Sequence, residues 1–126
     1  MKNWTEDELI KAGYKIENAQ ITYADLSMED HGCITLCMPL DGPGWGTVYG
    51  GYCLGHGYVG SKSFDSNKDS MVYIMKIMDT VGVSRFIDLK GKYIRVAVQG
   101  LSSPVKIIGN IMKDKWFDPD SFFEDL

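Results

Sequence analysis

The chain has 126 residues, of which 44% are hydrophobic, and its net charge is −4. This length and composition predict one ordinary folded domain, residues 1–126, with a sizeable buried core. The negative charge argues against direct nucleic-acid binding through phosphate contacts and favours a protein partner, particularly a basic one.

The N-terminal sequence lacks the apolar segment of a signal peptide, and no apolar run approaches the ~20 residues that span a bilayer. The three cysteines are an odd number, which is typical of a protein in a reducing compartment. We therefore expect a cytoplasmic protein that makes no membrane contact.

Residues 1–13 predict a short helix appended to the domain. Thr5 and Glu8 have the spacing of a capping box, and Gly13 is a suitable C-terminal stop. The alternation of apolar and polar residues over 14–24 then predicts a strand with one solvated face, which ends at residues 25–27.

Residues 29–60 contain both histidines, all three cysteines and most of the glycines. They predict one β-hairpin, with arms 32–40 and 46–54 around a turn at 41–45. Alternation along the first arm places two rows on opposite faces. One row is aliphatic (Ile34, Leu36, Met38 and Leu40), and the other consists of His31, Cys33, Thr35 and Cys37.

The cysteines and histidines of this hairpin are predicted to meet at its open end. If the loop is centred on Pro43, Leu40 faces Gly46 and Cys33 faces Cys53, with Cβ atoms about 4.5–5.5 Å apart. His31 then lies two residues before Cys33 on the same face, and His56 lies just past Cys53. A shift of the register by one residue would remove this convergence.

Two thiolates and an imidazole in such proximity are a donor set that tetrahedral Zn²⁺ prefers. We expect a structural zinc whose ligands are His31, Cys33, Cys53 and His56, with Asp30 or a water as the rival to His56. Cys37 is a poor ligand because it lies four residues along the strand from Cys33, about 13 Å away.

Two other interpretations of the cysteines stay open. They could be small apolar core residues, or Cys33 and Cys53 could form a cross-strand disulfide, which is uncommon in a reducing compartment. Zinc is favoured because histidine and cysteine gather on the face opposite an aliphatic row.

A helix is predicted from Ser66 or Asp69 to about residue 81, with Gly82 at its end. Its apolar stripe at helical spacing is interpreted as a buried face, and an adaptable methionine-rich binding surface is the alternative. The stripe consists of Met71, Ile74, Met75, Met78 and Val81. A second short helix at 85–90 follows, and then a second hairpin with arms 92–99 and 105–112.

The tail, residues 113–126, mixes acids with four aromatic residues, which we expect to dock on the core. The alternative is a partner-binding tail that acts through Asp118, Asp120, Phe122 and Phe123. Together the elements predict an α+β fold, in which an antiparallel sheet of hairpins carries one main helix and short flanking helices.

Six segments of the chain resemble a family of small phage and prophage proteins without an assigned enzymatic activity. They are residues 16–19, 29–33, 50–55, 77–83, 88–96 and 108–117. The most specific strings are Glu-Asp-His-Gly at 29–32 and Lys-Asp-Lys-Trp-Phe at 113–117, and the family pattern tolerates lysine at the position of His56. In length, acidic charge and phage-like character the chain is also similar to Cas9-directed anti-CRISPR proteins, some of which carry zinc.

The resemblance implies a phage-encoded inhibitor that binds a host defence nucleoprotein, a Cas9-type effector with its guide RNA, and blocks nucleic-acid loading by stoichiometric binding. It would act in the host bacterial cytoplasm on a zinc-stabilised scaffold, and the basic channel of such an effector would attract an acidic protein. The alternative is a phage accessory protein of replication or host takeover with another protein partner. A small zinc or Cys/His enzyme is the least favoured function, because the chain lacks a deaminase pattern, a zincin helix and a nucleophile elbow.

Overall fold

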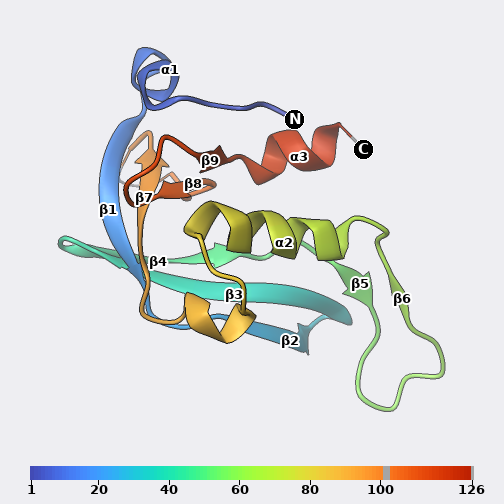
Figure 1. Cartoon of the computed structure of the whole chain (residues 1–126). Coiled ribbons are helices and arrows are strands. Elements are labelled where there is room, and N and C mark those ends of the chain that lie inside the picture. The colour runs from blue at the N-terminus through green and yellow to red at the C-terminus, as the bar shows by residue number, and fades with distance from the viewer. Residues whose placement is uncertain (101–102, 126) are drawn as a thin grey trace.

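The computed structural model describes residues 1–100 and 103–125. Over this range, nine strands form one antiparallel sheet and one main helix packs against it, which confirms the predicted α+β fold class (Figure 1). The helices are α1 (Glu6–Lys11), α2 (Ser70–Val81) and α3 (Pro119–Glu124), with a 3-10 helix η1 (Phe86–Leu89). The strands are β1 (Lys15–Ile21), β2 (Asp25–Asp30), β3 (Cys33–Gly42), β4 (Trp45–Gly50), β5 (Gly55–His56), β6 (Asp65–Ser66), β7 (Tyr93–Val98), β8 (Ile107–Asn110) and β9 (Trp116–Phe117).

The long strand β3 organises the sheet. Near its start it pairs with β2 on one edge and with β5 on the other. Near its end it pairs with β1 on the first edge and with β4 on the second. The sheet then continues from β1 through β7 and β8 to β9. As predicted from alternation, Leu36, Met38 and Leu40 of β3 point into the core, where each is at most 2% exposed.

The N-terminal helix forms as predicted. The Thr5 hydroxyl accepts a hydrogen bond from the Glu8 backbone N–H at 3.2 Å, and the Glu8 carboxylate accepts one from the Thr5 N–H at 3.1 Å. The helix is more than an appendage, however, because Leu9 is buried in a small cluster with Ala97, Ile107 and Trp116.

The predicted register of the β3–β4 hairpin is wrong by one residue. The loop contains only Pro43 and Gly44, so Gly42 pairs with Trp45 and Leu40 faces Thr47 instead of Gly46. Gly44 has φ 76, as the third residue of a Pro-Gly turn requires, and this tight turn starts the return strand earlier than predicted.

A separate strand, β2, begins where the sequence predicts only the end of the first strand. The chain bends after β1 and goes on as β2, which pairs with β3. Four of the six residues of β2 are exposed, so no alternation of buried and solvated residues marks this strand in the sequence.

The predicted buried stripe of α2 is also wrong in part. Tyr73, Ile74 and Ile77 face the core, whereas Met71 and Met75 are 64% and 60% exposed. Two overlapping stripes of α2 have helical spacing, and the one that contains the large ring of Tyr73 packs on the sheet. Gly82 ends the helix with φ 96, as predicted.

The remaining elements follow the prediction with small shifts of their ends. The second short helix is the 3-10 helix η1, and the second hairpin consists of β7 and β8. In the tail, Trp116, Phe117 and Phe122 are buried, which confirms the predicted docking of these aromatic residues on the core. The N-terminal segment and α3 lie side by side at one end of the molecule (Figure 1).

Candidate functional site

Cys33 and Cys53 form a disulfide at the start of β3. Cys33 is the first residue of this strand, Cys53 lies in the irregular segment between β4 and β5, and their Cα atoms are 5.4 Å apart. The two cysteines are therefore close together, as predicted, although the hairpin register from which this was predicted is wrong. The disulfide, the less favoured interpretation of the pair, is the form that the structure contains.

Two glycines after β4 bring Cys53 to this position. Gly50 and Gly51 have φ 116 and 91, which are accessible to glycine and strained for other residues. They turn the chain out of the β4 register, and Leu54 N–H then donates to the Ile34 carbonyl at 2.9 Å. As a result β5 pairs with β3 in a new register, in which His56 faces Cys33.

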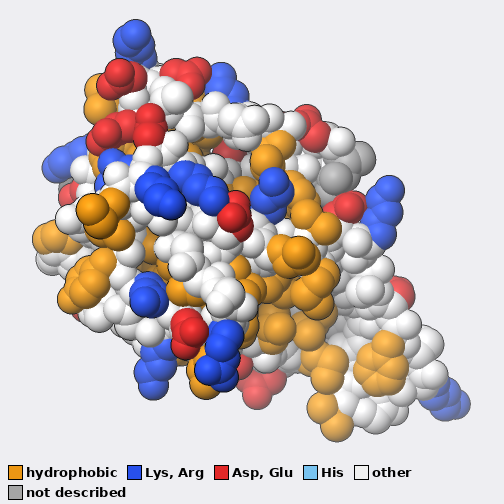
Figure 2. Space-filling model, in the orientation of Figure 1, with side chains coloured by type: hydrophobic (Ala, Val, Ile, Leu, Met, Phe, Trp, Pro, Cys, Tyr) orange, Lys and Arg blue, Asp and Glu red, His pale blue; other side chains and the backbone are white. Residues whose placement is uncertain are grey.

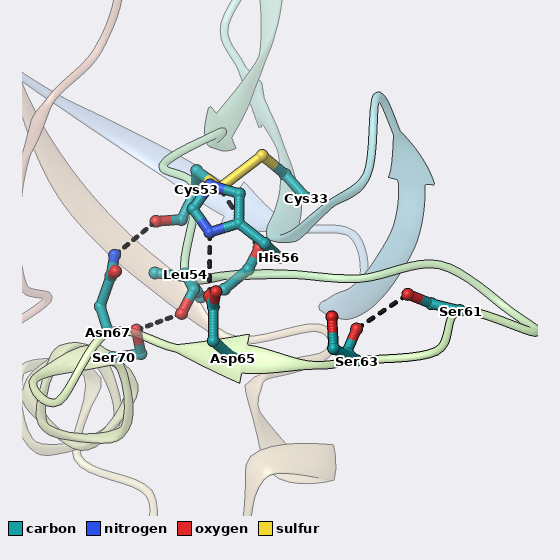
Figure 3. A network of polar contacts seen from close by, with 10 residues as sticks. Cys33, Cys53, Leu54, His56, Ser61, Ser63, Asp65, Asn67 and Ser70 are labelled. Carbon is teal, nitrogen blue, oxygen red and sulfur yellow. Dashed lines mark hydrogen bonds and ion pairs between the residues drawn. A yellow bond between two sulfur atoms is a disulfide. The ribbon is translucent and has the colours of Figure 1, made fainter.

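His56 connects the disulfide to an acid that sequence analysis missed. Its Nε2 lies 3.6 Å from Cys53 Sγ, and its Nδ1 lies 3.0 Å from Asp65 Oδ1 (Figure 3). When Nδ1 carries the ring proton and donates a hydrogen bond to Asp65, Nε2 is unprotonated and its lone pair points toward the sulfur. Asp65 faces His56 because β6 pairs with β5. The sequence of residues 57–66 has no pattern that predicts a strand.

The first residue of α2 and the segment just before this helix support the site. The Asn67 side-chain amide donates to the Cys53 carbonyl at 2.8 Å, and the Ser70 hydroxyl donates to the Leu54 carbonyl at 2.6 Å (Figure 3). Both bonds fix the backbone at Cys53 and at the residue that follows it. The sulfur atoms and His56 therefore lie on a supported segment, whereas the loop between β5 and β6, residues 57–64, extends outward from it (Figure 1).

Three of the four predicted metal ligands come together. The candidate ligand atoms of Cys33, Cys53 and His56 all lie within 4.8 Å of one another. His31 does not join them: it lies in the turn between β2 and β3 with φ 50, and its side chain is 95% exposed and 3.8 Å from that of Asp30. The strand alternation that placed His31 beside Cys33 stops at this turn, so the structure brings neither His31 nor Asp30 into the group.

The arrangement supports three kinds of chemistry. In the oxidised state Cys33–Cys53 is a covalent crosslink between β3 and the segment before β5. In the reduced state two thiolates and an imidazole are ligands for Zn²⁺, with Asp65 in the position of the carboxylate that commonly orients a metal-binding histidine. A reduced Cys53 with His56 and Asp65 also resembles a nucleophile, its base and an orienting acid.

Replacing Cys33 by serine in the oxidised protein is expected to lower the free energy of unfolding by about 3 kcal/mol, because the disulfide spans a sequence separation of 20 and restricts the unfolded chain. Cys37→Ser is the matched control, since Cys37 lies outside the disulfide. Urea unfolding of the three proteins measures the difference. The loss should disappear when all three are compared in a dithiol reductant with a metal chelator, and an equal loss in both variants would contradict the prediction.

A second feature is the exposed apolar face of α2, formed by Met71, Val72 and Met75, hereafter the α2 face. Val72 is 40% exposed, and the two methionines are exposed to a greater extent. Figure 2 shows hydrophobic side chains gathered over α2 and continuing toward the β5–β6 loop at the lower right. This loop carries three further exposed apolar side chains, Tyr58, Val59 and Phe64.

The tail residues predicted to bind a partner are engaged within the chain. Asp118 caps α3 by accepting from the Ser121 N–H, and it also accepts from the Trp4 indole at 3.1 Å. Phe122 is 6% exposed and belongs to the core, and the half-buried Phe123 packs against it. Phe122 therefore lies in the core and not on the surface of the folded chain.

Asp120 forms the polar centre of this region. Its carboxylate accepts from Lys106 Nζ at 2.8 Å and from the Tyr52 hydroxyl. Burial alone would raise the pKa of Asp120, but these two hydrogen bonds outweigh it and hold the pKa below its ordinary value. The ion pair thus stabilises the fold above the ordinary carboxyl pKa, and its contribution is lost as the pH falls through the lowered value.

No family model matches the chain, and no curated protein or solved structure shows significant similarity to it. None of the helices in the described part of the chain is long and apolar enough to cross a membrane. The function therefore has to be inferred from the chemistry of the site and from the exposed surfaces.

Proposed function

We propose that this chain is a non-catalytic binding protein that inhibits a basic host nucleoprotein by stoichiometric binding through the α2 face. The observation that carries the proposal is the exposure of Met71, Val72 and Met75 on the outer side of the main helix. A helix that packs one side on a sheet ordinarily presents polar residues to solvent at such positions. Exposed apolar patches of this kind commonly mark sites of protein–protein interaction.

The composition of the face supports a protein as the partner. Methionine is unbranched and polarisable, and it adapts its shape to the apolar surface of a partner. The exposed side chains of Tyr58 and Phe64 on the adjacent loop add aromatic groups, which are enriched in the contact regions of protein interfaces.

The net charge of −4 supports a basic partner surface. A Cas9-type effector with its guide RNA has such a surface in the channel that accommodates the heteroduplex. Together with the resemblance to anti-CRISPR proteins, this makes Cas9–guide RNA the first partner to test. Occupation of that channel would block the loading of nucleic acid.

Replacing Met71 and Met75 together by glutamate is expected to weaken partner binding at least tenfold, which corresponds to about 1.4 kcal/mol, because the variant places charges in an apolar contact. The thermal stability should stay close to that of the original chain, since both side chains are exposed. Ile10→Glu is the matched control, because Ile10 is 54% exposed on a different helix, α1. Binding is measured by calorimetry with purified Cas9–guide RNA, and inhibition by DNA cleavage.

Inhibition should saturate near one chain per effector. Inhibition at far lower ratios would indicate turnover and contradict the proposal, as would full binding by the double variant. If Cas9–guide RNA is not bound at all, this partner is excluded.

A further inference from the structure

We propose that Cys33, Cys53 and His56 bind one Zn²⁺ when the disulfide is reduced, so that the same position in the fold is closed either by a disulfide or by a metal ion. This inference concerns the end of β3 and does not depend on the function proposed for the α2 face. It rests on the distances between the three ligand atoms and on the contact of His56 with Asp65.

The imidazole and one sulfur already have the separation of zinc ligands. With Zn–S and Zn–N bonds of about 2.3 and 2.1 Å and a tetrahedral angle, the two ligand atoms lie about 3.6 Å apart. The distance from His56 Nε2 to Cys53 Sγ is 3.6 Å. The third ligand is Cys33 Sγ. It is bonded to Cys53 Sγ in the oxidised form, and the two sulfurs would separate to about 3.8 Å around the metal.

The backbone permits this change. The Cα atoms of Cys33 and Cys53 are 5.4 Å apart, so rotation about the side-chain bonds can separate the sulfurs without moving the strands. Hydrogen bonds from Asn67 and from Leu54 N–H hold the backbone next to Cys53 independently of the disulfide. The ligand positions are therefore retained when the disulfide is opened.

Asp65 prepares His56 for this role. Its carboxylate lies 3.0 Å from Nδ1, which favours the tautomer that presents an unprotonated Nε2 to the sulfurs. The His56 side chain is 63% exposed, so the fourth ligand position faces solvent and would take a water molecule. Soft thiolate ligands select zinc over the hard cations Mg²⁺ and Ca²⁺.

Reduction of the disulfide precedes binding of the metal. A dithiol reductant breaks the S–S bond and is oxidised to its own disulfide, and each cysteine sulfur receives one proton. Zn²⁺ then forms two Zn–S bonds and one Zn–N bond, and the two thiol protons are released to water. The metal would join β3 to β5, whereas the disulfide joins β3 to the segment before β5.

The test uses the full chain, reduced with dithiothreitol, freed from the reductant without oxygen, and titrated with Zn²⁺ alone. The reduced chain is expected to retain one zinc per chain after gel filtration, and the oxidised chain essentially none. Co²⁺ in place of Zn²⁺ should give the thiolate charge-transfer absorption and the visible bands of a tetrahedral site. Failure of the reduced chain to take up either metal would overturn the proposal.

Variants identify the ligands. His56→Ala keeps both cysteines and can be checked for folding in its oxidised form, and we expect it to reduce the zinc affinity of the reduced chain more than tenfold. Asp65→Asn should reduce the affinity about tenfold, as is typical for a residue that orients a ligand. His31→Ala and Cys37→Ser should bind zinc like the original chain, because neither residue belongs to the group. Undiminished binding by His56→Ala, or a loss in His31→Ala, would show that the ligand set is wrong.

Discussion

Replacement of Gly50 by alanine is expected to lower the free energy of unfolding by about 3–5 kcal/mol, which combines backbone strain with a steric clash. Gly50 ends β4 with φ 116, and a Cβ atom at this position would lie 2.1 Å from the Leu36 carbonyl oxygen. This oxygen belongs to the backbone of β3 in the middle of the sheet, so it cannot move aside. Because Gly50 directs the chain toward Cys53, the variant should also form the disulfide more slowly during oxidative refolding.

Gly51→Ala is the matched control. Gly51 also has a positive φ, 91, but apart from its two chain neighbours no described residue has an atom within 4 Å of a Cβ at this position. We expect a loss of about 1–2 kcal/mol from the backbone conformation alone. Urea unfolding measures both variants, and similar losses would contradict the assignment of the larger effect to the contact with β3.

Phe122→Ala is the second change with a large expected effect, a loss of about 3–4 kcal/mol from the free energy of unfolding. The Phe122 ring packs edge-on against Phe117 and Phe123, with centroid distances of 5.8 and 5.1 Å. Truncation would leave a cavity where α3 meets the core. Thermal and urea unfolding give the loss directly.

Phe64→Ala serves as the control for this truncation, because the Phe64 side chain is 63% exposed on the β5–β6 loop. Its effect on stability should be within about 0.5 kcal/mol. The comparison also separates the two interpretations of the tail. A Phe122→Ala protein of unchanged stability that no longer binds its partner would restore the partner-binding interpretation and contradict the core assignment.

Local features of the fold follow from the sequence. The capping box of α1, the glycine that ends α2 and the inward row of β3 all depend on residues a few positions apart. The physical interactions that produce them are contained within one helical turn or one strand. For this reason the type and order of the main elements, and with them the α+β class, could be predicted.

The arrangement of these elements depended on contacts between distant segments. The two-residue turn at Pro43 and Gly44 shifted the hairpin register by one, since register is set by turn geometry and not by alternation alone. In α2, two overlapping stripes satisfy helical spacing, and only packing of Tyr73 against the sheet determined that Met71 and Met75 face solvent. The strand β2 forms because β3 offers a free edge to a largely polar segment.

The same division applies to the candidate site. The sequence by itself determined which side chains could form a disulfide or bind zinc, because those capacities belong to cysteine and histidine as chemical groups. The tertiary structure alone decided which of them meet. The positive φ angles of Gly50 and Gly51 bring Cys53 back to Cys33, the β5–β6 pairing supplies Asp65, and the turn after β2 directs His31 into solvent. These contacts are produced by backbone conformations and strand pairings that join residues far apart in the chain, and sequence spacing does not specify them.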